Sequence, residues 1–215
     1  GQTRGRRREG SGGTEGSSRG DSGTIRSPGG SIIDQVPRLQ IGCVSLGAEI
    51  ARGSYAKVIR GSYCGKPCAY KEFHCAHLSS STVPELIKRE VLAAWRLQHE
   101  TVVEFWGFFV DPPKVYLGFE YCHKGSLFDT LHKPRKNHRS PVPIAWEGRV
   151  RMAWDACRAI EHLHAQDYCH RDIKSLNFLV GTALDGNDVV KLADFGESKE
   201  SQDHMTARQA GTLHW

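Results

Sequence analysis

The sequence has no apolar run near the roughly 18 residues that a membrane-spanning helix needs, and no charged-then-apolar leader opens it. Its seven cysteines are scattered without a C-x-x-C pair, which argues against a disulfide-rich secreted domain. The excess of positive over negative charge is also small, because the formal net charge of the 215 residues is only +5. These absences predict a soluble, cytoplasmic protein, and they argue against a nucleic-acid-binding surface on the folded part.

Apolar residues are nearly missing from residues 1–31, which are rich in Gly, Ser and Arg. Such a segment cannot bury enough surface to offset the entropy of ordering, so we predict a disordered tail. Most of the net charge lies here, and the folded remainder is close to neutral. The basic cluster Arg4–Arg8 is read first as a solvated charge run, with a localisation signal or a contact to RNA or anionic lipid as alternatives.

The remaining sequence carries the apolar content of a packed domain, 39% over the whole chain. Short β-rich runs with glycine-containing turns predict an antiparallel meander over residues 41–73, with a hairpin at Gly65 and Lys66. Apolar periodicity then predicts further elements in this order: a helix over Pro84–Gln98, strands over Val102–Val110 and Val115–Tyr121, and a helix over Glu147–His164. A mostly β half followed by a mostly α half predicts an α+β arrangement in two lobes.

Two short motifs near the end of the chain carry the strongest chemical signal. They are H-R-D-I-K-S-L-N at His170–Asn177 and, 16 residues later, D-F-G at Asp194–Gly196. Transfer of a γ-phosphoryl group needs a carboxylate near the attacking hydroxyl, a cation on the moving phosphate and oxygen ligands for Mg²⁺. That set is present as Asp172, Lys174, Asn177 and Asp194.

In this order and spacing the motifs resemble the catalytic loop and metal-binding motif of eukaryotic protein kinases. The resemblance runs from about Ile41 to Trp215 and implies the two-lobed kinase fold, with ATP and Mg²⁺ as its cofactors. Residues 32–122 would form a complete β-rich N-lobe with the hinge, and residues 123–215 a partial, truncated C-lobe. By this resemblance, Asp172 accepts the proton of the substrate hydroxyl, Lys174 offsets charge on the γ-phosphate, and Asn177 and Asp194 hold Mg²⁺.

The nucleotide-covering loop departs from the family pattern. The glycine-rich motif G-x-G-x-x-G-x-V corresponds to A-R-G-S-Y-A-K-V at Ala51–Val58, which keeps only the central glycine, Gly53. Glycine serves there because backbone N–H groups must approach the phosphates closely. We therefore expect weaker or slower nucleotide handling, not its loss.

The rest of the nucleotide site follows from the same resemblance. Lys71, within C-A-Y-K, would grip the α- and β-phosphates and pair with Glu90, which lies 19 residues on; Glu85 is a competitor for that role. The remaining positions are the adenine ceiling (Val58 and Ala69), the adenine floor (Leu179), a bulky gatekeeper (Phe119) and the hinge (Glu120, Tyr121 and Cys122).

Two further features concern substrate and control. At the positions of Lys174 and Thr212 the sequence resembles Ser/Thr kinases. The segment I-K-S-L-N-F-L-V resembles the tyrosine-kinase-like group, near Raf and mixed-lineage kinases. Protein serine and threonine hydroxyls are thus the expected acceptors. Arg171 suggests activation by an upstream kinase, because a phosphate could pair with it. The candidate phosphorylation sites are Ser198, Ser201 and Thr206.

Two alternatives remain at this stage. The first is a zinc site, because thiolates and imidazoles suit Zn²⁺, although their spacing here is wrong for common fingers; its ligands would come from Cys64, Cys68, His74, Cys75 and His77. The second is a non-catalytic nucleotide-binding pseudokinase or scaffolding fragment, suggested by the two alanines and by the expected truncation. Truncation would also leave apolar surface on the helix over Glu147–His164 without its packing.

Overall fold

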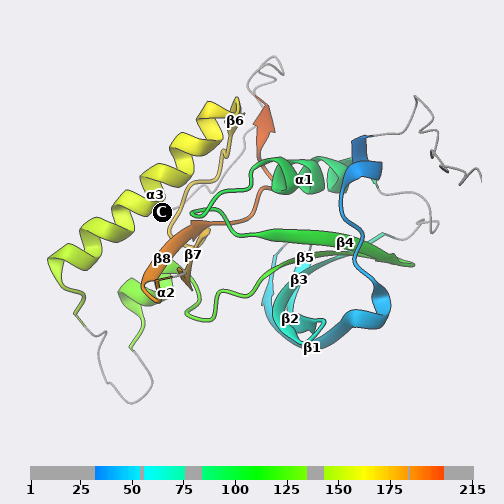
Figure 1. The fold of residues 1–215 in the computed structure, drawn as a ribbon, viewed down its shortest axis with the longest axis horizontal. Coiled ribbons are helices and arrows are strands. Elements are labelled where there is room, and N and C mark those ends of the chain that lie inside the picture. The colour runs from blue at the N-terminus through cyan, green and yellow to red at the C-terminus, as the bar shows by residue number, and fades with distance from the viewer. Residues whose placement is uncertain (1–31, 54–55, 76–83, 135–142, 184, 201–215) are drawn as a thin grey trace, which may run out of the picture. The chain divides into compact units, whose positions relative to one another are not determined.

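A five-stranded antiparallel sheet dominates the first half of the described chain (Figure 1). The computed structural model describes residues 32–53, 56–75, 84–134, 143–183 and 185–200. The sheet has the order β1-β2-β3-β5-β4. Its strands are β1 (Val44–Arg52), β2 (Ala56–Tyr63), β3 (Lys66–His74), β4 (Phe105–Asp111) and β5 (Lys114–Glu120). The predicted α+β class is confirmed.

The two-residue turns of the sheet, β2–β3 and β4–β5, follow from local sequence. Tyr63 pairs with Lys66, so Cys64 and Gly65 form a two-residue hairpin turn with φ values of 47° and 79°. Positive φ at both turn positions matches the right-handed twist of the flanking strands. The predicted hairpin is present, with its turn one residue earlier than the sequence suggested. Asp111 likewise pairs with Lys114 across two prolines.

The strand register gives the sheet two different faces. On β2, β3 and β5, Val58 pairs with Lys71 and Lys71 pairs with Leu117, so these three side chains share one face. The other face holds a separate apolar cluster made of Leu39, Ile59, Cys68, Tyr70, Phe109 and Tyr116. Lys71 is therefore the polar residue on a face whose neighbours are apolar.

Helix α1 (Glu85–Arg96) packs against β4 (Figure 1). Ile87, Val91 and Ala94 recur at helical spacing, are all buried and join the main core cluster. The helix begins directly after Pro84, whose missing N–H costs nothing at a helix start. The predicted helix over Pro84–Gln98 is thus present with slightly tighter ends.

The described residues of the second half form two helices and four short strands: α2 (Leu127–His132), α3 (Trp146–Ala165), β6 (Tyr168–Cys169), β7 (Phe178–Thr182), β8 (Asp188–Leu192) and β9 (Lys199–Glu200). Helix α3 packs on β8, where the buried Asp155 carboxylate accepts the Val190 N–H at 3.0 Å. Trp146, Val150 and Trp154 of α3 are exposed. Among the helices of the described ranges, none is long and apolar enough to cross a membrane.

The segment 101–103 corrects one predicted strand. Sequence patterns predicted a strand over Val102–Val110, but β4 begins only at Phe105. Residues 101–103 pair instead with the end of β8: Leu192 N–H donates to Thr101 O at 2.8 Å, and Val103 N–H donates to Leu192 O at 2.9 Å. A partner about 90 residues away competes with β5 for these backbone groups.

Two stacked imidazoles join the loop after α1 to helix α3. The rings of His99 and His162 lie 4.6 Å apart at 19°. Within the described residues, Nε2 of His162 is buried without a hydrogen-bond partner. Burial, with a smaller contribution from His99, lowers the pKa of His162. Glu100, the neighbour of His99 in the chain, forms an ion pair with Arg158 of α3.

This stack predicts a loss of stability on acidification. Because the pKa of His162 is lower in the folded chain, the unfolded chain binds the extra proton more readily below about pH 6.5. His162 therefore stabilises the fold less as the pH falls. Between pH 7.5 and pH 5.5, the melting temperature of His162→Phe should therefore fall by less than that of the parent chain.

His123→Phe is the matched control, because His123 is exposed in the linker after β5. This variant should keep the parent's pH dependence. Equal pH dependence in His162→Phe and the parent chain would contradict the assignment.

Candidate functional site

A short chain of charges links three elements on the Lys71 face of the sheet. Lys71 Nζ lies 2.5 Å from Glu90 Oε1 and 2.8 Å from Asp194 Oδ1. The side chains of Lys71 and Glu90 are only 18% and 6% exposed, whereas that of Asp194 is 52% exposed. Lys71 thus contacts two carboxylates, the buried one of Glu90 and the solvent-exposed one of Asp194.

The protonation states in this chain of charges follow from its contacts. Burial disfavours the Lys71 ammonium, but Glu90 and Asp194 outweigh burial and raise the pKa of Lys71. Partial desolvation likewise opposes ionisation of Asp194, yet Lys71 lowers the pKa of that carboxyl. For Glu90, burial raises the pKa while Lys71 opposes the shift. Lys71 is therefore a cation, with Asp194 as its anionic partner.

A second cluster forms in the loop that contains the H-R-D motif. Asp172 Oδ2 accepts a hydrogen bond from Asn177 Nδ2 at 2.9 Å and lies 2.6 Å from Lys174 Nζ. Asn177 Nδ2 also donates to the Asp172 backbone carbonyl at 2.8 Å. One oxygen of Asp172 is therefore fixed by two donors, which orients the carboxylate.

His170 and Ala193 tie this loop to the D-F-G motif. His170 Nδ1 accepts the Asp172 N–H at 3.3 Å, so its Nε2 carries the proton and donates to the Ala193 carbonyl at 3.0 Å. Burial lowers the pKa of His170, which favours this neutral form. Ala193 N–H in turn donates to Asn177 O at 2.8 Å. Sequence reasoning gave His170 no role, although its place in the motif was the available signal.

The residues predicted to line the adenine site are partly exposed beside buried neighbours. Val58, Ala69, Phe119 and Leu179 are half-buried, whereas residues next to them in β3 and β7 are fully buried. Ala69 pairs with Phe119 across β3 and β5, so both lie on the Lys71 face. An apolar face with partial exposure suits a flat heteroaromatic ring.

The predicted hinge runs from Glu120 to Cys122. The Glu120 side chain is engaged within the protein, because its Oε1 lies 2.5 Å from Lys191 Nζ and accepts the Glu104 N–H at 2.8 Å. Among the described residues, the Cys122 N–H has no backbone hydrogen-bond partner. Cys122 itself is buried, and burial raises the pKa of its thiol to about 12.

The loop predicted to cover the phosphates is described only at its ends. Gly53 N–H donates to the Ala56 carbonyl at 2.8 Å, which closes the turn between β1 and β2. Ser54 and Tyr55 lie outside the described residues. A Cβ on Gly53 would meet only the Ala56 carbonyl, at an ordinary 3.5 Å, so local packing does not explain this glycine.

Each of the two charge clusters contains an oxygen donor suited to Mg²⁺, Asp194 in the first and Asn177 in the second. Because Asn177 Nδ2 is used by Asp172, its Oδ1 is directed elsewhere. Lys71 contacts Asp194 Oδ1, and the Asp194 side chain is 52% exposed, so this carboxylate is open to another cation. Carboxylate and amide oxygens are hard ligands of the kind Mg²⁺ prefers, so this donor set fits the ion.

The zinc alternative gains no support from the structure. No group of three or more metal-binding side chains occurs in the described ranges. Cys68 is fully buried in the apolar cluster with Tyr70, whereas Cys64 is exposed at the hairpin turn. His77 lies outside the described residues.

The activation-segment candidates are only partly described. Ser201, Thr206 and Thr212 lie outside the described residues. Ser198 Oγ donates to the Phe195 carbonyl at 2.5 Å, and Ser198 N–H donates to the same oxygen at 3.1 Å. The Ser198 hydroxyl is therefore engaged in a local turn.

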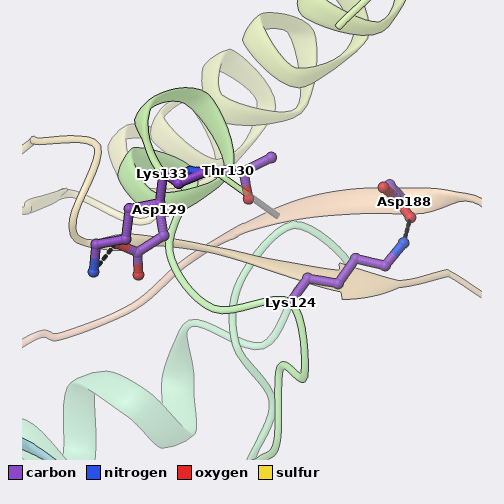
Figure 2. Close-up of a pocket in the computed structure, with 6 residues that line it drawn as sticks. Lys124, Asp129, Thr130, Lys133 and Asp188 are labelled. Atoms are coloured by element: carbon purple, nitrogen blue, oxygen red, sulfur yellow. Dashed lines mark hydrogen bonds and ion pairs between the residues drawn. The ribbon is translucent and has the colours of Figure 1, made fainter. Parts of the chain in front are cut away.

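A cavity of about 340 Å³ lies away from these clusters, between α2 and the start of β8 (Figure 2). Figure 2 shows Lys124 reaching Asp188 and Asp129 beside Lys133, and both are ion pairs. Its charges are thus paired within the protein. None of the predicted site residues lines it.

Comparison with known families identifies the chain. The model of the protein kinase domain matches residues 44–215. The chain belongs to the protein kinase domain family. The family membership predicted from the two motifs is confirmed, and the charge clusters lie within the matched region.

Similar proteins point in the same direction. Over 80% of its length, the chain is 32% identical to a plant protein named serine/threonine-protein kinase STY46 and 35% identical to the probable serine/threonine-protein kinase SIS8, both from Arabidopsis thaliana. The probable serine/threonine-protein kinase drkA of Dictyostelium discoideum is 31% identical over the same share. The chain spans only 28%, 16% and 25% of these relatives' lengths, respectively.

The buried pair predicts a large effect of neutralising Glu90. Glu90→Gln leaves the Lys71 ammonium with Asp194 alone on a largely desolvated face, which should cost about 3 kcal/mol of unfolding free energy. Chemical denaturation at neutral pH measures this change.

Glu100→Gln is the matched control, because Glu100 forms an exposed ion pair with Arg158. Exposed pairs contribute little, so the control should unfold close to the parent chain. Equal destabilisation by the two variants would show that the buried pair has no special role.

Proposed function

We propose that the chain is the phosphoryl-transfer part of a protein serine/threonine kinase. The observation that carries this proposal is the arrangement of two charge clusters joined through one residue. Lys71, Glu90 and Asp194 form the first cluster, Asp172 and its neighbours form the second, and Ala193 hydrogen-bonds the second to the start of the D-F-G motif.

In the proposed mechanism, Asp172 acts on the acceptor. Lys174 and Asn177 both engage Asp172 Oδ2 and so orient the carboxylate that would accept the proton of a protein hydroxyl. As the hydroxyl oxygen attacks the γ-phosphorus of ATP, the bond from phosphorus to the β–γ bridging oxygen breaks and ADP leaves. Lys174 is close enough to Asp172 to offset charge on the same phosphate.

The nucleotide would be held from the Lys71 face. Lys71 would bind the α- and β-phosphates, with Glu90 fixing its ammonium group. Val58 and Ala69 would cover the adenine, Leu179 would lie beneath it, and the Cys122 N–H would donate to a ring nitrogen. Mg²⁺, held by Asn177 and Asp194, would neutralise charge on the phosphates.

Serine and threonine are the proposed acceptors for two reasons. Lys174 occupies the position that marks Ser/Thr kinases in the family resemblance, and the relatives carry serine/threonine-protein kinase names. By its I-K-S-L-N-F-L-V segment, the chain resembles the tyrosine-kinase-like group. Control by an upstream kinase through Arg171 and the activation segment remains part of this proposal.

Replacement of Asp172 tests the mechanism. Asp172→Asn keeps the size of the side chain but removes the proton acceptor, so phosphate transfer should fall by about a thousandfold. ATP binding should persist, because Lys71 and the adenine face are unchanged. Transfer from radiolabelled ATP to peptides bearing only Ser, Thr or Tyr measures both rate and acceptor class.

Asp185→Asn serves as the control, since Asp185 lies in an exposed turn bonded to Asn187. It should transfer phosphate like the parent chain. Undiminished transfer by Asp172→Asn would refute the mechanism, and transfer mainly to the Tyr peptide would refute the Ser/Thr assignment.

A non-catalytic nucleotide-binding module is the second candidate, and the alanines at positions 51 and 56 favour it. A methyl group at Ala56 is the smallest intrusion on backbone N–H groups that approach the phosphates. Ala56→Gly should therefore raise the affinity for ATP several-fold in a fluorescence titration.

Ala48→Gly makes the same change at an exposed position of β1 and should leave ATP affinity unaltered. Unchanged affinity in both variants would show that Ala56 does not limit nucleotide binding. A parent chain that binds ATP but never transfers phosphate, even with Ala56→Gly, would favour the second candidate.

A further inference from the structure

Residues 32–39 form an ordered segment that precedes the region matched by the kinase model, which begins at residue 44. We call this segment the N-terminal strap. It opens with the 3₁₀ turn η1 (Ile32–Gln35) and continues along β4. Leu39 N–H donates to Phe108 O at 2.9 Å, and Phe108 N–H donates to Pro37 O at 3.1 Å.

The strap closes part of an open sheet edge. Strand β4 is last in the sheet order and has β5 as its partner strand on one side only. The bridge between Arg38 and Phe108 supplies partners on its other side, and the Arg38 guanidinium lies 4.9 Å from the centre of the Phe108 ring. An edge with free backbone groups is thereby covered.

The strap also reaches both faces of the sheet. Ile33 and Val36 are buried in the core cluster that contains Ile87 and Val91 of α1. Leu39 belongs to the separate cluster on the opposite face. The strap therefore crosses over β4, and its first turn contacts α1, as Figure 1 shows for the blue segment beside that helix.

Two glycines leave room for this crossing. A Cβ on Gly107, whose φ is +140°, would lie 2.5 Å from the Pro37 carbonyl oxygen. A Cβ on Gly118 would lie 2.6 Å from Leu39 Cδ1. β4 and β5 thus lack side chains at the points where the strap approaches most closely.

The strap is one of the elements that position helix α1. Its N-cap residue, Pro84, makes no side-chain cap, and the helix packs against β4 and η1. Glu90 lies between Ile87 and Val91, two of the α1 residues that share the strap's core cluster. Because the contact from Lys71 to Glu90 is 2.5 Å, a shift of the helix by about 1 Å brings it to the limit of a hydrogen bond.

We propose that the N-terminal strap is a positioning element: through Ile33 and Val36 it holds α1 at the distance at which Glu90 engages Lys71. The strap acts on catalysis through α1 and touches no reacting group. Its effect on phosphate transfer rests on the proposed kinase function, but its effect on α1 does not.

Hydrogen exchange of the full chain tests the proposal directly. Ile33→Ala should speed exchange of α1 amides by about tenfold, while amides of the β2–β3 hairpin stay within about twofold of the parent. Ile32→Ala is the matched control, because Ile32 lies in the same turn but is 38% exposed. It should leave α1 exchange unchanged, and Ile33→Val should restore most of the protection.

Two results would overturn the proposal: uniform acceleration across α1 and the hairpin, which marks a merely structural role, or unchanged α1 exchange. If Ile33→Ala does not fold, Val36→Ala removes less volume from the same contact and is judged by the same criteria.

Kinetics adds an independent readout where the parent chain transfers phosphate. Ile33→Ala should lower kcat about tenfold with little change in KM for ATP. In a Glu90→Gln background the same substitution should lower kcat no further, because its route of action is already broken. Additive losses would overturn the proposal. Absence of transfer in the parent would refute the proposed function, and the exchange experiment would still decide the role of the strap.

Discussion

The buried contact between Lys71 and Glu90 is the constraint around which the described chain is arranged. A desolvated ammonium and a desolvated carboxylate are each costly alone, so each must meet the other. This fixes the separation of β3 from α1, two elements that do not pair through their backbones. It also fixes which face of the sheet becomes partly exposed, the face on which Val58 and Ala69 lie.

The end of β8 joins this arrangement to the second half of the chain through three successive residues. Leu192 pairs with the loop at residues 101–103, Ala193 bonds to His170 and Asn177, and Asp194 reaches Lys71. A single stretch of backbone thus positions a carboxylate against a lysine 123 residues away. A small displacement of this stretch would change contacts in both charge clusters at once.

The sequence predicted the elements whose signal is local and missed those whose signal is not. Helix α1 and the two tight turns follow from periodicity and turn chemistry. The pairing of residues 101–103 with β8 depends on a distant partner, and strands of two to five residues, such as β6 and β7, are too short for periodicity. The motifs predicted which residues should gather because their chemistry is specific. They did not predict the crossing of β4 by the strap, since Ile33 and Val36 look like ordinary apolar residues.

The cysteine in the linker has a consequence for chemical probes. Electrophiles such as acrylamides react with thiolates, and burial raises the pKa of Cys122 to about 12, so almost no thiolate exists there at neutral pH. A ligand bound against the Lys71 face of the sheet would gain no covalent bond from this sulfur. Cys64 at the β2–β3 turn, Cys157 on α3 and Cys169 on β6 are exposed, so irreversible labels are expected to mark these three cysteines before the one in the linker.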